Sequence, residues 1–103
     1  GMTVMENILQ AQPEIDGIFC HNDEMALGAL RAIEAAGRLS AIKIVGFDAT
    51  DDAVKSVKDG KMVATVAQKP RVMGSMAVET AKQVLDGVKV GAFIPVPLEL
   101  IVK

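Results

Sequence analysis

The sequence predicts an α/β fold in which a parallel sheet is flanked by helices. Short apolar runs alternate with amphipathic helical patterns along the whole chain. This alternation is typical of parallel strands joined by right-handed helical crossovers. Glycine or proline stands at most points where one pattern gives way to the next, as expected for turns and helix ends. We therefore expect the order helix–strand repeated four times.

The first part of the chain is expected to hold two helices and one strand. Apolar residues repeat at helical spacing ahead of Pro13, and the residue before a proline disfavours the α conformation, so the first helix ends there. A short buried strand is expected over residues 15–20. The next helix carries a continuous apolar stripe. Asn22 or Asp23 can cap its start, and Gly37 is a natural stop at its end.

Two further strands are predicted over residues 42–47 and 62–67, which are rich in apolar and β-branched residues. A short helix is expected between them, because Thr50 can cap its start and Gly60 can end it. Strands connected through helices in this way are expected to run parallel.

The last part of the chain is predicted to form a fourth helix and a fourth parallel strand. Pro70 suits the first turn of a helix, where its missing N–H would have no partner anyway, and Gly87 ends the pattern. Residues 97–102 make the last strand, in which prolines mark a turn or an edge position. The expected buried face of the fourth helix consists of Met73, Ala77, Ala81, Val84 and Leu85.

Length and composition exclude several classes of function. The chain has 103 residues, which favours one domain. Its formal net charge of −2 does not favour nucleic acids or anionic membranes, which attract basic patches. No apolar run approaches the roughly 20 residues that span a bilayer, and the start lacks the features of a signal peptide. A single cysteine excludes an internal disulfide.

Three polar residues follow directly on the apolar runs. Asn22, Asp48 and Gln68 each stand where a predicted strand ends. If these strands are parallel, the three side chains gather at the edge of the sheet where open α/β folds bind ligands. Two amides and a carboxylate offer both hydrogen-bond donors and acceptors. This chemistry favours binding of a polyhydroxylated ligand over the making or breaking of bonds.

Other polar residues have simpler interpretations. Cys20 and His21 are neighbours in a strand, so their side chains point to opposite faces and do not form a nucleophile–base pair. Asp51 and Asp52 fall in the first turn of a helix, where the dipole favours negative charge. Asn22 is open to two interpretations, a helix cap or a ligand contact. With one His, one Cys and no glycine-rich phosphate loop, the sequence predicts no metal, no cofactor and no enzymatic activity.

Several stretches carry a family resemblance, in order along the chain. Residues 16–29 read DGIFCHNDEMALGA, residues 44–50 read IVGFDAT, and residues 59–61 and 64–70 read DGK and ATVAQKP. This combination resembles the sugar-binding proteins of bacterial ABC transporters, and among them the ribose-binding group. The resemblance is to the C-terminal part of these two-lobed proteins. It implies a truncated periplasmic-binding-protein-like fold, with a flavodoxin-like half-lobe.

The resemblance also implies a division of the chain and a set of site residues. Within a single partial domain, residues 1–68 would be part of the C-terminal lobe, and residues 69–103 the hinge-crossing helix and last strand. Asn22, Asp48 and Gln68 match family positions that hydrogen-bond sugar hydroxyls.

The partners that the resemblance implies are a sugar and a membrane permease. Family members bind a monosaccharide between two lobes that close by hinge motion, and the closed form is presented to the ABC permease. A ribose-like sugar would also need the N-terminal lobe, which this chain lacks. The implied location is periplasmic or extracellular.

Two other functions stay open. The effector-binding domain of LacI-type transcriptional regulators has a similar junction after its strand, although the stretch from Val57 to Gln68 fits the transport group better. An uncovered sheet edge also favours a homodimer, formed through that edge or by exchanged elements, in a fragment without ligand function.

Overall fold

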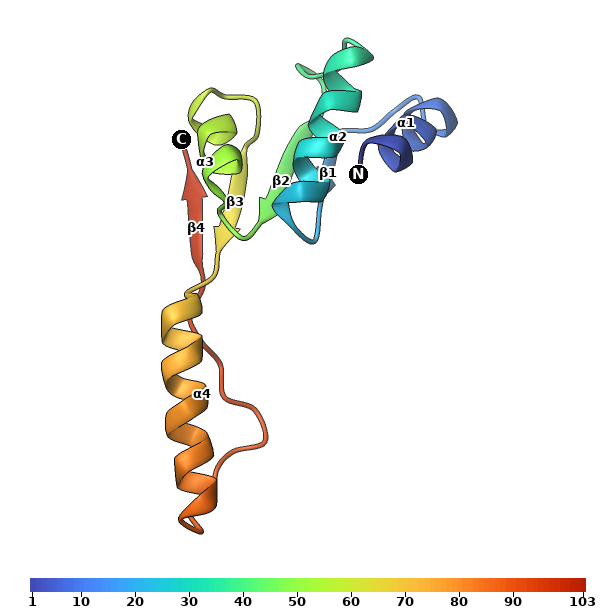
Figure 1. The fold of residues 1–103 in the computed structure, drawn as a ribbon. Coiled ribbons are helices and arrows are strands. Elements are labelled where there is room, and N and C mark those ends of the chain that lie inside the picture. The colour runs from blue at the N-terminus through green and yellow to red at the C-terminus, as the bar shows by residue number, and fades with distance from the viewer. The chain divides into compact units, whose positions relative to one another are not determined.

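The computed structural model describes residues 1–103, and it confirms the predicted alternation of helices and strands (Figure 1). None of the helices combines the length and the hydrophobicity needed to cross a bilayer. The elements in chain order are α1 (Met2–Ala11), β1 (Gly17–Phe19), α2 (Asp23–Ala35), β2 (Lys43–Phe47), α3 (Asp51–Lys58), β3 (Ala64–Ala67), α4 (Pro70–Leu85) and β4 (Glu99–Val102).

The chain divides into two compact units. Unit 1 comprises residues 1–67 and 99–103, and so contains the four strands with α1, α2 and α3. Unit 2 comprises residues 68–98, which are α4 and the segment that follows it.

The sheet of unit 1 has the strand order β1-β2-β3-β4. The first three strands are parallel, as predicted. The expectation of a fourth parallel strand is wrong, because β4 runs antiparallel to β3, with Ala67 opposite Glu99 and Ala64 opposite Val102. The chain leaves the sheet after Ala67 and re-enters beside that same residue. A parallel strand would have required a return to the opposite end of β3.

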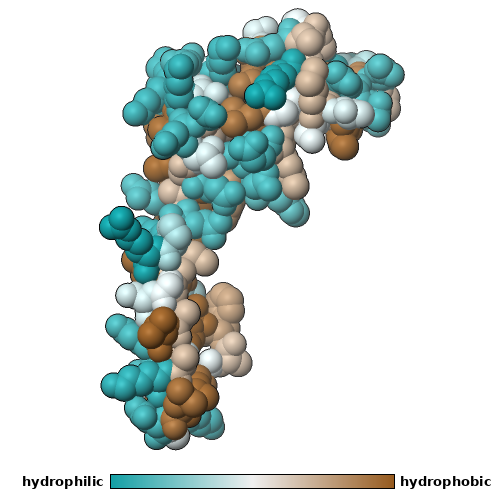
Figure 2. Space-filling view, in the orientation of Figure 1, coloured by the Kyte–Doolittle hydropathy of each residue, from teal (hydrophilic) through white to brown (hydrophobic).

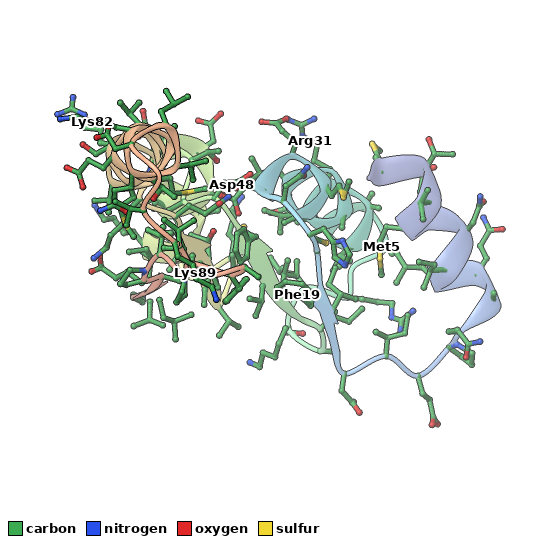
Figure 3. The ribbon with its side chains drawn as sticks, turned by 90° about the horizontal axis from the view of Figure 1, so that it is seen from below. Met5, Phe19, Arg31, Asp48, Lys82 and Lys89 are labelled. Atoms are coloured by element: carbon green, nitrogen blue, oxygen red, sulfur yellow. The ribbon has the colours of Figure 1, made fainter.

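The core of unit 1 lies between the sheet and the helices α2 and α3. Ile33 of α2, Ile44 of β2 and Val57 of α3 are fully buried there. The helix α1 packs against α2, and Met5 points from α1 into the same core (Figure 3). Because consecutive right-handed crossovers step in one direction across the sheet, α2 and α3 lie on the same face (Figure 1).

The opposite face of the sheet carries exposed apolar side chains. Phe19, Leu100 and Val102 are 58%, 61% and 57% exposed, and the strand register places them on the same face as Val45 and Phe47. The expectation of a buried strand over residues 15–20 is therefore wrong. The strand β1 lies at the edge of the sheet, with a neighbour on one side and a helix layer on one face.

Unit 2 has no buried residue in its helix. The 16 residues of α4 include none that is buried, so the predicted buried face of Met73, Ala77, Ala81, Val84 and Leu85 is wrong. The apolar pattern is present, but unit 2 offers only the segment after the helix to cover it, where Ile94 and Val96 line a shallow hollow with Met73 and Met76. Apolar side chains consequently show on the surface of this unit (Figure 2).

Candidate functional site

The three predicted site residues fall at three strand ends. Asn22 comes shortly after β1, and Asp48 directly follows β2. Since β1 and β2 are parallel neighbours, both residues lie at the carboxyl edge of the sheet in unit 1. Gln68 directly follows β3 and is the first residue of unit 2. The strands therefore bring Asn22 and Asp48 to one edge, and Gln68 stands where the chain leaves unit 1.

Asn22 acts as a helix cap. Its Oδ1 accepts a hydrogen bond from the backbone N–H of Met25 at 2.9 Å. This contact satisfies one of the amides that the first turn of α2 leaves without an intrahelical partner, so the cap interpretation of Asn22 is confirmed. The same bond fixes the orientation of the side chain. It engages the carbonyl oxygen and leaves the amide nitrogen as a donor for other contacts.

Asp48 has an unusual backbone. Its φ is 118°, and that of Ala49 is 56°. Non-glycine residues rarely adopt such angles, and each costs on the order of 1–3 kcal/mol. The Asp48 N–H donates to the carbonyl of Val66 at 2.8 Å, so the ladder between β2 and β3 continues one residue beyond the strand. The chain then turns sharply at Asp48, whose carboxylate is a candidate for ligand binding.

A buried hydrogen-bond network lies beneath this turn. The carboxylate of Asp23 is fully buried; its Oδ1 accepts from the Thr65 hydroxyl at 2.7 Å and its Oδ2 from the Thr50 N–H at 2.8 Å. The Thr65 Oγ1 in turn accepts from the Ala49 N–H at 3.1 Å. No buried side-chain nitrogen or oxygen is left without a partner. The network therefore joins the start of α2, the turn after β2 and the strand β3.

Sequence reasoning missed this network. It assigned Asp23 to the start of the helix and gave Thr65 no role, although Thr65 is fully buried. One sequence signal was Gly46 in the middle of a strand, where glycine often marks a close approach. A Cβ at Gly46 would collide with Oδ1 of Asp23, so the glycine provides the space that the carboxylate occupies.

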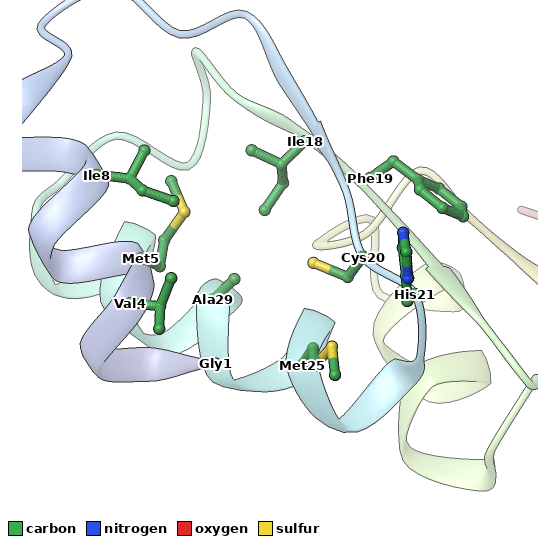
Figure 4. A pocket seen from close by; sticks show the side chains of 10 residues that line it. All are labelled: Gly1, Val4, Met5, Ile8, Ile18, Phe19, Cys20, His21, Met25 and Ala29. Atoms are coloured by element: carbon green, nitrogen blue, oxygen red, sulfur yellow. The ribbon is translucent and has the colours of Figure 1, made fainter.

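Cys20 and His21 do not form a catalytic pair. Cys20 lines an apolar hollow of about 380 Å³ between α1, β1 and α2 (Figure 4). Burial raises the pKa of its thiol, and the charge of the chain's terminal amine partly offsets this effect. The His21 ring, which lines the same hollow, packs at a tilt against that of Phe19, with centroids 5.9 Å apart. No group of three or more His, Cys, Asp or Glu side chains is placed to hold a metal ion.

Named relatives are proteins of sugar import. The ribose import binding protein RbsB of Escherichia coli K12 is 53% identical over 103 residues, which are 100% of this chain and 34% of that protein. The ribose import binding protein RbsB of Bacillus subtilis 168 is 52% identical over 100 residues, 97% of this chain and 32% of that protein. The chain thus spans about a third of the length of these relatives. Both are named for binding and import, in agreement with the prediction of a non-enzymatic protein.

The fold matches that of another solute-binding protein. An ABC transporter periplasmic solute-binding protein from Actinobacillus succinogenes 130z, solved with bound D-allose, matches with a TM-score of 0.84 and 35% identity, over 98% of this chain and 36% of that one. The predicted α/β class is confirmed by this match. The sequence pattern of the periplasmic binding protein domain also covers residues 1–89, which is more than half of the chain. The chain belongs to the periplasmic binding protein domain family.

Proposed function

We propose that this chain is part of a sugar-binding protein that serves uptake through an ABC transporter. The observation that carries the proposal is the arrangement of Asn22 and Asp48 at the carboxyl ends of two parallel strands, in a chain half identical to ribose import binding proteins. Those relatives also favour transport over the alternative of a LacI-type effector-binding domain. The ligand is a ribose-like monosaccharide.

Asn22, Asp48 and Gln68 form one wall of the sugar site in this proposal. A carboxylate such as that of Asp48 can accept from two adjacent hydroxyl groups, and charge-assisted bonds of this kind are strong and directional. The amide nitrogen of Asn22 can donate to a sugar oxygen while its Oδ1 caps α2. Gln68 offers a donor and an acceptor at the point where the chain passes from unit 1 to unit 2.

The opposite wall and the transport partner lie outside this chain. Residues 1–68 belong to the C-terminal lobe, and residues 69–103 provide the hinge-crossing helix and the last strand. The remaining contacts come from the portion that corresponds to the other two thirds of the relatives. The closed, sugar-loaded protein delivers its ligand to an ABC permease in the periplasm or outside the cell. The proposed mechanism is binding by hinge closure, without chemistry.

Calorimetry with ribose tests this proposal in two proteins. The 103-residue chain alone should bind ribose weakly or not detectably, because one wall of a site lacks most of the contacts. A chimera, in which this chain replaces the matching third of the E. coli ribose import binding protein, should bind ribose with micromolar affinity or better. Micromolar binding by the chain alone, or no binding by a folded chimera, would contradict the proposal.

Two substitutions in the chimera test the assignment of Asp48. Asp48→Asn should weaken ribose binding at least about tenfold, because the charged acceptor is lost while asparagine tolerates the positive φ. Asp51→Asn is the matched control, since Asp51 is an exposed acid in the first turn of α3 and has no proposed ligand contact. Equal affinities of the two variants would remove Asp48 from the site.

We also propose that the chain by itself forms a homodimer, through the edge of β1 or by exchange of elements. The unpaired outer edge of β1 and the exposed apolar face around Phe19 support this proposal. Light scattering should report a dimer at tens of micromolar, and Phe19→Lys should shift it to monomer. Phe93→Lys, at an exposed aromatic residue of unit 2, should leave the dimer intact. A clean monomer of the unsubstituted chain would refute the proposal.

A further inference from the structure

Asp23 is the single charged residue in the buried core of the protein. The proposed sugar contacts do not use it, and helix capping does not require it, since Asn22 already caps α2. We propose that Asp23, together with Thr65, is a positioning residue of the sugar site, which holds the turn at residues 48–50 so that the Asp48 carboxylate faces the ligand. This inference rests on the proposed function of Asp48 as a sugar contact.

Three successive backbone N–H groups of the turn are held by three different partners. The N–H of Asp48 donates to the Val66 carbonyl at 2.8 Å, which any strand could provide. The next two donate to side chains: that of Ala49 to Thr65 Oγ1 at 3.1 Å, and that of Thr50 to Asp23 Oδ2 at 2.8 Å. The Asp23–Thr65 pair therefore fixes the two peptide N–H groups that follow Asp48, the proposed sugar-binding residue.

The turn needs this support because its backbone is strained. Asp48 and Ala49 are the two non-glycine residues of the chain with positive φ, at 118° and 56°. Such conformations persist where the surroundings over-determine them, and they are often found at ligand sites. The hydrogen bonds from the turn to Asp23 and Thr65 provide this constraint. In their absence the turn can relax toward negative φ, which would redirect the Asp48 side chain.

The network has little tolerance for exchange of its members. The Thr65 hydroxyl donates to Asp23 Oδ1 and accepts from the Ala49 N–H, so it bridges the carboxylate and the turn. A methyl group in its place would leave both partners unsatisfied in a buried site. Both carboxylate oxygens of Asp23 accept hydrogen bonds. Asparagine at this position would place its NH₂ group, a donor, against either the Thr65 hydroxyl or the Thr50 N–H, which are also donors. The missing Cβ of Gly46 keeps the space open.

Nuclear magnetic resonance on the full 103-residue chain tests the positioning role directly. In Asp23→Asn, hydrogen exchange at the Ala49 and Thr50 amides should accelerate at least about tenfold more than exchange at the core amides of α2. The one-bond Cα–Hα couplings of residues 48 and 49 should move away from values of positive φ. Glu24→Gln, at the exposed acid next to Asp23, is the matched control and should change neither quantity.

A second pair of variants keeps the test decisive if Asp23→Asn does not fold. Thr65→Val removes the bridging hydroxyl at constant shape and should reproduce the local changes, whereas Thr65→Ser restores the hydroxyl and should rescue them. Uniform acceleration of exchange across unit 1, with unchanged couplings at residues 48 and 49, would show that the network only stabilises the fold and would overturn the inference.

Ribose affinity in the chimera connects the network to function. Asp23→Asn or Thr65→Val should weaken ribose binding at least about tenfold in a folded chimera, whereas Glu24→Gln and Thr65→Ser should stay within about threefold of the unsubstituted chimera. Full affinity in a folded Asp23→Asn chimera would refute the positioning role in binding. If the unsubstituted chimera does not bind ribose, the proposed function fails, and the backbone measurements on the chain still decide whether Asp23 and Thr65 hold the turn.

Discussion

The two units of this chain differ in how they use the same amphipathic pattern. In unit 1, apolar stripes of α2 and α3 meet the strands β2 and β3, and Ile33, Ile44 and Val57 are removed from solvent. In unit 2, α4 carries a comparable stripe over 16 residues, but none of them is buried. Leu85 is 87% exposed and Val78 is 72% exposed. An amphipathic pattern therefore predicts a helix, and only a facing partner turns its stripe into a core.

This difference separates the regions that can hold a ligand precisely from those that cannot. A core fixes Asp23 and Thr65, and these residues in turn contact the backbone that follows Asp48. Isolated helices of about the length of α4 are marginally stable in water. The helix α4 by itself therefore gives weak support to Gln68, which lies shortly before its first residue.

Hydrogen exchange should show the largest difference between the units. Core amides of α2 are exposed only on global unfolding, whereas amides of α4 open locally with little loss of buried surface. With roughly 5 kcal/mol of global stability, exchange in the middle of α4 should be on the order of a thousandfold faster than exchange around Ile33. Equal protection of the two helices would show that α4 is stabilised by contacts that unit 2 does not contain.

Truncation of a core side chain should cost more than truncation of an exposed one. Ile33→Ala removes a fully buried side chain and should lower the free energy of unfolding by about 3 kcal/mol. The matched change in unit 2, Leu85→Ala, should stay within about 0.5 kcal/mol because the side chain is 87% exposed. Urea unfolding of both variants measures the difference, and a loss at Leu85 comparable to that at Ile33 would reveal a hidden partner for α4.

Helix caps offer a smaller contrast. Thr50 caps α3 by accepting from the Ala53 N–H at 3.4 Å, and Thr50→Ala should destabilise unit 1 by about 1 kcal/mol. The helix α4 has Lys69 at the equivalent position and no side-chain cap. Lys69→Ser should therefore increase the helicity of α4 in circular dichroism and slow its amide exchange. No gain in Lys69→Ser would mean that the start of α4 is already satisfied by other groups.

The ion pair between Lys61 and Glu34 should have the smallest effect. The two groups are 2.8 Å apart with side chains 48% and 35% exposed, so water and salt screen the attraction. The hydrogen bond and charge of Glu34 raise the pKa of Lys61 above its ordinary value. A raised lysine pKa stabilises the fold below the unfolded-state pKa and loses this contribution as pH rises through the folded-state pKa. Lys61→Gln should thus lower the free energy of unfolding slightly at neutral pH and low salt. In strong alkali, the free energies of unfolding of the variant and the unsubstituted chain should become equal.

Local features of the fold could be predicted from the sequence, and non-local ones could not. The caps at Asn22 and Thr50 depend on partners three residues away, so the residue types alone made both residues candidate caps. The bonds of Asp23 span 27 and 42 residues. No periodicity relates Asp23 to Thr50 or Thr65, and sequence reasoning accordingly assigned Asp23 only to the start of a helix.

The sequence by itself determined the alternation of helices and strands, the parallel order of β1 to β3 and the position of polar residues at the strand ends. These features follow from short-range periodicity and from the fixed handedness of crossovers. The tertiary structure decided that β4 runs antiparallel, that the stripe of α4 stays exposed and that a buried carboxylate supports the turn after Asp48. Each of these depends on which distant surfaces meet, because burial and hydrogen-bond satisfaction are properties of pairs of segments rather than of one segment.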